Sequence, residues 1–168
     1  MQKSKGFTLV ELVIVIVILG ILAVTAAPKF LNLAGDAKEG TLTAVQGSLQ
    51  SANAVVYSKA VLASKQKEAT ATITDSTFSG NLNLVYGYVK ADKADVDKVL
   101  DVSDSEFVSA QGVANTALSI TTADVVIRPA SVSAQDGNTT VDNACLLVYK
   151  SAASTTTKPT YVIHGNGC

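Results

Sequence analysis

Apolar residues are concentrated in one continuous run near the amino end of the chain. From Phe7 to Ala27 the sequence reads FTLVELVIVIVILGILAVTAA, in which Glu11 is the single charged residue. A helix rises about 1.5 Å per residue, so the run spans roughly 30 Å, the thickness of a bilayer's hydrocarbon core. The pattern predicts a helix long enough to cross a membrane.

Beyond this run, the spacing of apolar residues indicates that the helix continues with one apolar face. Small and apolar residues recur every three or four positions, as on one side of an amphipathic helix. They are Phe30, Ala34, Ala37, Thr41, Val45, Leu49, Ala52, Val56, Ala60 and Ala63. We predict one helix from Phe7 to about Lys67, roughly 90 Å long, with this stripe packed on a sheet.

After Lys67 the chain consists of short segments separated by turn residues. Residues 68–80 are small and polar, which favours a loop containing one short strand. Residues 81–89 alternate as in a half-buried strand, and residues 91–100 have helical character. Strands are predicted at 71–74, 81–89, 118–121, 124–127, 145–150 and 160–164. The predicted fold class is α+β: a long amino-terminal helix, apolar in its first half and amphipathic in its second, packed on an antiparallel β-sheet head.

Composition and charge exclude several classes of function. The 168 residues carry 13 basic and 14 acidic side chains and a net charge of −1, which offers no cationic surface for nucleic acid. One His and two Cys exclude His-rich and Cys-rich metal sites. His164 has no second His or nucleophile motif beside it and is interpreted as a surface or loop histidine. We therefore expect a protein that is not an enzyme and has no cofactor.

An acidic run at residues 92–106 is the remaining candidate for a metal site. Its six carboxylates lack the D-x-D-x-D-G order of an EF-hand, so we interpret them as a solvated face rather than a calcium site. Asn138 begins an Asn-Thr-Thr sequon, which we interpret as a turn.

The acid inside the apolar run needs an explanation. Placing a carboxylate in hydrocarbon costs of order 2.5 to 3.5 kcal/mol, so Glu11 is expected to have a cationic partner. Lys3 and Lys5 precede the run, which predicts a cytoplasmic amino end and an exported remainder. A secretory signal peptide cleaved near Val24–Ala26 is an alternative, although the run is longer than usual for such a peptide and gives Glu11 no role.

The residues around Glu11 resemble a known signal. The stretch Lys5-Gly6-Phe7-Thr8-Leu9-Val10-Glu11-Leu12, a basic leader ending in Gly before FTLVE, is similar to the class III signal of type IV pilins and pseudopilins. The resemblance implies that a prepilin peptidase cuts after Gly6 and methylates the new amino terminus at Phe7. It also implies that Glu11 pairs with the amino terminus of a neighbouring subunit during assembly, a register-setting use of a buried ion pair.

Two residues are predicted to interrupt the helix. Pro28 lacks an amide proton and clashes with the carbonyl of Val24, and Gly20 lowers helix stability. Type IV pilins resembling this sequence have Gly and Pro here, and their filaments can lose helix between them. The resemblance thus implies a kink or local melting that makes a pilus extensible, although neighbours in a membrane can also tolerate both residues.

The likeness extends to one subfamily. The segments VIVIVILGILAVTAAPKFLNLAGDA, VYSKA and CLLVYK, with the final Gly167-Cys168, resemble major pilins of the mannose-sensitive haemagglutinin (MSHA) type within the type IVa class. This implies a helical homo-oligomer, first single-pass in the inner membrane with a cytoplasmic amino terminus and later an extracellular filament. Its implied partners are the prepilin peptidase, a platform protein, assembly ATPases, an outer-membrane secretin and surface carbohydrate. Its implied roles are adhesion and biofilm formation.

Two cysteines in an exported chain predict a disulfide. Cys145 and Cys168 would close a loop of about 24 residues, worth roughly 3 to 4 kcal/mol in the chain-entropy estimate; two free thiols are the alternative. In pilins resembling this chain, such a loop lies at the filament surface and varies with the binding role.

The predicted organisation has four segments. They are a leader at 1–6, a transmembrane and filament-core helix at 7–34, an amphipathic half at 35–68, and a β-rich head at 69–168 with the disulfide loop 145–168. Two other functions remain alternatives at this point: a major pseudopilin of a type II secretion system, which generally lacks the cysteine pair and uses calcium, and a periplasmic enzyme tethered by its helix.

Overall fold

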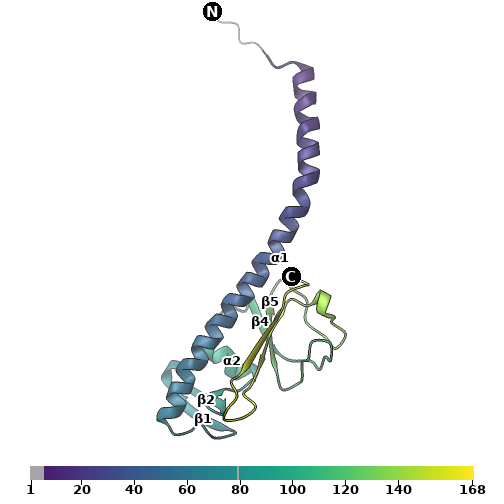
Figure 1. Ribbon diagram of the computed structural model, residues 1–168. Coiled ribbons are helices and arrows are strands. Elements are labelled where there is room, and N and C mark those ends of the chain that lie inside the picture. The colour runs from purple at the N-terminus through teal and green to yellow at the C-terminus, as the bar shows by residue number, and fades with distance from the viewer. Residues whose placement is uncertain (1–5, 79) are drawn as a thin grey trace, which may run out of the picture.

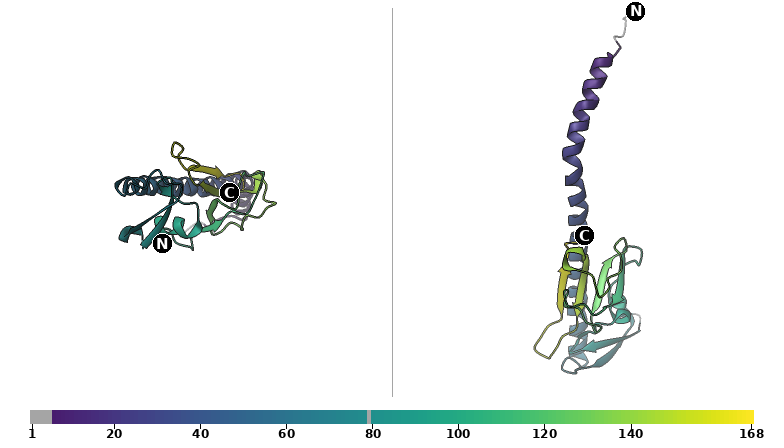
Figure 2. Two further views of the ribbon diagram at one scale, coloured as in Figure 1. Left: turned by 90° about the horizontal axis from the view of Figure 1, so that it is seen from below. Right: turned by 90° about the vertical axis from the view of Figure 1, so that its right-hand side faces the viewer.

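One long helix dominates the molecule and carries a small head on its second half (Figure 1). The computed structural model describes residues 6–78 and 80–168, and for residues 27–32 it describes the backbone alone. Figure 2 shows the first half of the helix projecting away from the head, with the carboxyl end of the chain near the point where the helix leaves the head. We call this point the neck. The predicted α+β class is confirmed.

Helix α1 runs without interruption from Leu9 to Leu62. It begins at Thr8, whose side chain and that of Glu11 form a reciprocal capping box. It ends at Leu62 rather than at the predicted Lys67 because Ser64 takes a left-handed backbone conformation with φ of 59°. Lys65 then folds back and donates its backbone N–H to the oxygen of Ala60.

The buried face of α1 differs in part from the predicted stripe. It consists of Leu42, Val45, Leu49, Asn53, Val56 and Ala60. The stripe was wrong at Ala34, Ala37, Thr41 and Ala63, which are exposed, and the side chain of Phe30 lies outside the described residues. The physical reason is that Ala34, Ala37 and Thr41 precede Leu42, the first buried position of α1, whereas Ala63 follows the last helical residue, Leu62.

The first sheet is a three-stranded antiparallel hairpin unit at the far end of α1. Its strands are β1 (Ala71–Asp75), β2 (Gly80–Val85) and β3 (Tyr88–Val89), in that order, with the 3-10 helix η1 (Ser76–Phe78) between the first two. The prediction of one strand over 81–89 was wrong. Tyr86 and Gly87 both have positive φ, 50° and 83°, and form a tight turn that reverses the chain.

The second sheet has four antiparallel strands in chain order. They are β4 (Phe107–Gln111), β5 (Val125–Pro129), β6 (Leu146–Lys150) and β7 (Thr160–His164). Helix α2 (Lys93–Val99) precedes β4, and the 3-10 helix η2 (Val141–Asn143) precedes β6. Strand β4 was missed, and the predicted strand at 118–121 is wrong: it makes one bridge, Asn115 to Ile120, because Ser119 turns with φ of 54°.

A buried polar network joins α1 to both sheets. Asn53 is 3% exposed; its Nδ2 donates to the hydroxyls of Tyr161 at 2.8 Å and Tyr149 at 3.2 Å. Its Oδ1 accepts from the backbone N–H of Val89 at 2.9 Å, and the Tyr149 hydroxyl donates to the Val89 carbonyl at 2.5 Å. Every buried polar group in this set therefore has a partner, as stability requires.

Candidate functional site

The apolar first half of α1 is uncovered in the single chain. Residues Leu9–Ala26 form a helix long and apolar enough to cross a membrane, and none of this span is buried. Its large side chains, from Leu9 to Val24, are exposed at 44% or more. So much exposed apolar surface is stable only in lipid or against other apolar helices.

Glu11 holds the start of this helix in the single chain. Its Oε2 accepts from the backbone N–H of Thr8 at 2.8 Å and from the Thr8 hydroxyl at 2.7 Å. The backbone N–H of Glu11 donates in return to Thr8 Oγ1 at 3.3 Å. This cap was not predicted, although Thr followed by Glu three residues later is its signature. The negative charge of Glu11 also lies in the first helical turn, where the helix dipole favours it.

The predicted cleavage point lies beside this cap. Gly6 and Phe7 are exposed and precede the helix, whereas residues 1–5 of the predicted leader lie outside the described residues. Cleavage after Gly6 would place an ammonium group on Phe7. This group would lie next to the Thr8 backbone N–H and hydroxyl, which donate hydrogen bonds to Glu11. Cleavage, methylation and the pairing of Glu11 between subunits stay predictions.

The predicted interruption of the helix is not a feature of the single chain. Gly20 lies within the continuous α1, and a Cβ added there would meet no atom within 4 Å. The side chain of Pro28 lies outside the described residues. Since melting was predicted for the filament, it stays a prediction.

The two cysteines form the expected disulfide. The bond joins Cys145, which precedes β6 and is 1% exposed, to Cys168. Gly167 lies so close to Asn143 that a Cβ would stand 2.3 Å from the Asn143 carbonyl carbon. The Gly167 N–H donates to the oxygen of Ala144 at 2.9 Å, which fixes the tail to the segment before β6.

The disulfide-bonded tail also touches α1 at the neck. The Nζ of Lys38 donates to the backbone oxygen of Cys168 at 3.1 Å. A Cβ on Gly35 would stand 3.4 Å from the Cys168 carbonyl carbon, and one on Gly165 would stand 2.6 Å from the Glu39 carboxyl. The tail therefore contacts α1 around residues 35–39, between the apolar half of the helix and the packed half. No local sequence pattern predicts this contact.

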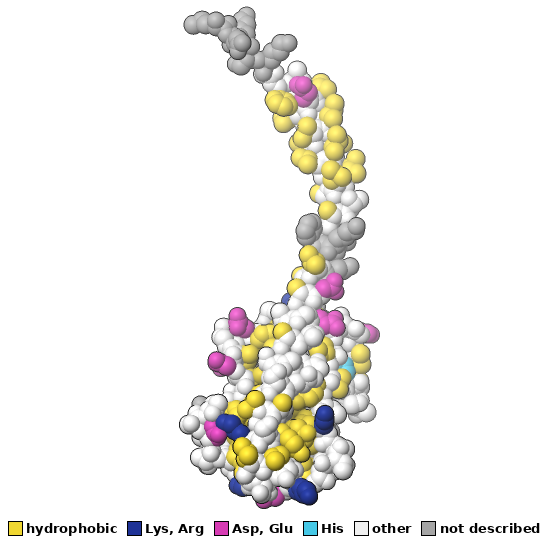
Figure 3. Space-filling view, turned by 60° about the vertical axis from the view of Figure 1, so that its left-hand side comes forward, with side chains coloured by type: hydrophobic (Ala, Val, Ile, Leu, Met, Phe, Trp, Pro, Cys, Tyr) yellow, Lys and Arg dark blue, Asp and Glu magenta, His cyan; other side chains and the backbone are white. Residues whose placement is uncertain are grey.

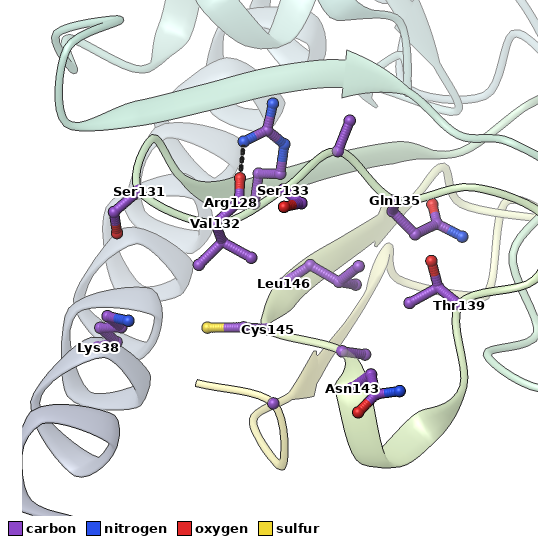
Figure 4. A pocket seen from close by; sticks show the side chains of 13 residues that line it. Lys38, Arg128, Ser131, Val132, Ser133, Gln135, Thr139, Asn143, Cys145 and Leu146 are labelled. Carbon is purple, nitrogen blue, oxygen red and sulfur yellow. Dashed lines mark hydrogen bonds between the residues drawn. The ribbon is translucent and has the colours of Figure 1, made fainter. Parts of the chain in front are cut away.

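A cavity of about 470 Å³ adjoins this region. Figure 4 shows it between α1, where Lys38 lies, the segment after β5 and the segment before β6. The guanidinium of Arg128 donates across it to the backbone oxygen of Val132. The lining combines the cations Lys38 and Arg128 with hydroxyl, amide and small apolar side chains.

The acidic run of residues 92–106 does not gather in one place. Asp92 caps α2, Asp97 pairs with Lys93 at 2.5 Å, and Asp95 is buried. The solvated-face interpretation is therefore wrong at Asp95, which accepts from the backbone N–H of Asn83. Within the described residues, no group of three His, Cys, Asp or Glu side chains could hold a metal ion.

His164 lies at the end of β7 and is partly covered. Burial lowers the pKa of its imidazole, and a hydrogen bond with the Leu118 backbone opposes that shift. Of the two predicted settings, surface or loop, the loop is wrong because His164 belongs to β7, where it is half-buried.

Comparison with known proteins adds two similarities. Residues 1–27 match the prokaryotic N-terminal methylation motif. The chain is 44% identical over 54 residues to the type IV narrow pilus major component PilA5 of Thermus thermophilus, covering 32% of this chain and 47% of that protein. The chain thus spans about half the length of the curated relative it matches. No solved structure matches it.

Both similarities support a type IV pilin. The long apolar helix followed by a second helix and antiparallel sheets is consistent with the type IV pilin fold. A pilin is a structural subunit rather than an enzyme, and the pseudopilin alternative is not favoured. The motif and the uncovered apolar helix fit a membrane-anchored pilin that is later assembled into a pilus.

Proposed function

We propose that this chain is the structural subunit of a type IV pilus filament that attaches cells to surfaces and to each other and supports biofilm formation. The observation that carries the proposal is the uncovered helix Leu9–Ala26, which follows a methylation motif and contains one capped carboxylate. Lipid covers this helix before assembly and other copies cover it in the filament. Both environments are dry, so one apolar surface acts as anchor and as packing interface.

Processing prepares this surface. In the proposal, a prepilin peptidase cleaves after Gly6 and methylates Phe7, and the new ammonium neutralises Glu11 of a neighbouring subunit as the helix leaves the membrane. The platform protein, assembly ATPases and secretin supply energy and a passage to the outside. The amino terminus faces the cytoplasm before assembly.

Attachment is assigned to the head. The proposal places contact with surface carbohydrate in the disulfide loop 145–168, in accordance with the MSHA-like segments of the sequence. The support from the structure is that the loop carries exposed hydroxyls at residues 155–157, between β6 and β7, on a disulfide-bonded frame.

The intact mass of the protein in sheared extracellular material tests the proposal. We expect loss of residues 1–6, one added methyl group, and two hydrogens fewer than the reduced chain. The same mature mass found only in the cell envelope would contradict a surface filament. A species beginning near Ala27 would show that the helix is a cleaved signal peptide.

Attachment needs its own test. Cells producing only this pilus should bind a carbohydrate-coated surface, and an equal number of cells lacking the chain should not. Wild-type cells could form normal filaments while cells lacking the chain show unchanged attachment and biofilm mass. That result would remove the adhesive role and leave the structural one.

A further inference from the structure

Charge is distributed unevenly along the head, between the neck and the far end where α1 stops. In Figure 3 most acidic side chains lie near the neck and most basic ones near the far end. We call these regions the neck end and the distal end. Because both ends are exposed, this separation of charge can attract and orient a partner of opposite charge.

The neck end collects carboxylates from three parts of the chain. Asp36 and Glu39 lie on α1 beside the disulfide tail. The loop before β4 reaches the neck end because the Glu106 oxygen accepts from the N–H of Ala130, which precedes the segment lining the Lys38 cavity. The exposed carboxylates at this end are Asp36, Glu39, Asp101, Asp104, Glu106, Asp136 and Asp142. Among the described residues, the cations beside them include Lys38, Arg128 and Lys93, and Lys93 lies near Asp104 but is already paired with Asp97.

The distal end presents lysines. Lys65 and Lys67 follow the end of α1, and Lys90 adjoins the first residues of β1. Lys158 lies in the loop between β6 and β7, beside Tyr57 of α1. Glu68 and Asp92 are the carboxylates near this group, whereas the nearby Asp75 is already paired with Lys59 at 2.5 Å.

The two ends cannot neutralise one another within one chain. From Asp36 to the end of α1 at Leu62 the helix alone spans about 40 Å. The Debye length at physiological ionic strength is about 8 Å, so the field of one end is screened at the other. Unlike charges from the two ends meet only when two copies come together.

The apolar half of α1 sets the relative orientation of neighbouring copies. Every copy enters the membrane through the same helix in the same orientation, so copies that bundle by this helix keep their heads parallel. A shift of one copy along the bundle then brings its neck end towards the distal end of another. We infer that successive subunits dock head to tail through the carboxylates of the neck end and the lysines of the distal end, an inference that rests on the proposed filament.

Zero-length coupling of carboxylates to lysines in intact wild-type filaments tests the contact directly. Peptide mapping should find bonds between Asp101, Asp104 or Glu106 and Lys67 or Lys158. Within one subunit, Glu106 adjoins Ala130 at one end of the second sheet, whereas Lys158 lies beyond the Lys150–Thr160 pair at its other end. Bonds within the pairs Lys93–Asp97 and Lys59–Asp75, both 2.5 Å apart, serve as the internal positive control. Recovery of these control bonds without any neck-to-distal bond would overturn the inference.

Charge reversal gives an independent test. Lys67→Glu with Lys158→Glu should lower sheared filament yield at least five-fold, because like charges then face each other. Asp101→Lys with Asp104→Lys should do the same, and the fourfold variant should return to within two-fold of wild type. Glu68→Lys is the matched control; it adds positive charge to the distal end and should leave the yield unchanged.

The readouts separate this inference from the proposed function. Wild-type cells without filaments would contradict the proposed function itself. Filaments of normal yield from both double-reversal variants, or a fourfold variant that stays as low as either double variant, would overturn the head-to-tail contact alone. The disulfide content and membrane level of each variant, measured on the full chain, identify a folding defect. If a variant has such a defect, the coupling result on wild-type filaments decides whether the head-to-tail contact exists.

Discussion

The Nζ of Lys38 donates a hydrogen bond to the backbone oxygen of Cys168 across 3.1 Å, joining residues 130 positions apart. The bond ties the disulfide-bonded tail to α1 at the neck. Any force carried by the apolar half of α1 reaches the head first at this contact. The disulfide and the Lys38 contact therefore act on the same junction, and two variants separate them.

Cys168→Ser should destabilise the head by about 2 to 5 kcal/mol, because the loop it closes gains freedom in the unfolded chain. Lys38→Met keeps the disulfide and should lose about 1 kcal/mol, the net value of one hydrogen bond. Thermal unfolding of the full chain in detergent measures both. We also expect less pilus and weaker attachment from Cys168→Ser; an unfolding temperature equal to wild type would contradict the stabilising role.

Glu11→Ala should give a protein that is processed and membrane-bound but largely absent from sheared filaments, because no carboxylate remains to meet a neighbouring amino terminus. Thr8→Ala is the matched control. It removes the cap, worth about 1 kcal/mol of helix stability, but keeps the carboxylate, so filaments should persist. Abundant filaments from Glu11→Ala would contradict the pairing.

Asn53→Ala should lower the free energy of unfolding by about 2 to 3 kcal/mol. The change leaves the buried N–H of Val89 without an acceptor and removes the partner of two tyrosine hydroxyls. Gln50→Ala, an exposed position one turn earlier on α1, should change stability by less than about 0.5 kcal/mol. Equal unfolding curves for the two variants would show that the network contributes nothing.

Asp75 should make stability depend on acid pH. The hydrogen bond from Lys59, with those from Thr77, lowers the pKa of its carboxyl from 3.8 to about 2. A folded-state pKa below the unfolded one stabilises the fold above about pH 4, and this contribution disappears as pH falls through 2. The unfolding temperature of wild type should exceed that of Asp75→Asn at pH 5, and the gap should close towards pH 2. A gap that stays constant would exclude the linkage.

Pro28→Ala should make the filament less extensible, because the substitution restores a helical hydrogen bond in the stretch between Gly20 and Pro28 where melting is predicted. Force–extension curves of single filaments measure the change. Gly40→Ala, a helical glycine with open space at its Cβ, controls for increased helix propensity elsewhere in α1. Curves identical to wild type for Pro28→Ala would count against local melting.

Local patterns predicted the elements that depend on neighbouring residues. The helix, the strands β1, β5, β6 and β7, and α2 were all placed near their observed bounds, because alternation and helical periodicity are local properties. The prediction of a single strand over 81–89 was wrong because Tyr86 adopts a positive φ, which tyrosine rarely does. Strand β4 was not predicted because apolar and polar residues alternate only weakly over Phe107–Gln111. The strand forms through its pairing with β5.

The sequence by itself determined the apolar helix, the position of Glu11 within it, the α+β class and the two cysteines available for a bond. These follow from hydrophobicity, spacing and residue chemistry. Only the tertiary structure decided where the head begins to cover α1, that the disulfide tail contacts Lys38, and that carboxylates from α1 and two loops share the neck end. These relations join residues far apart in the chain, and packing rather than local preference sets which of them meet.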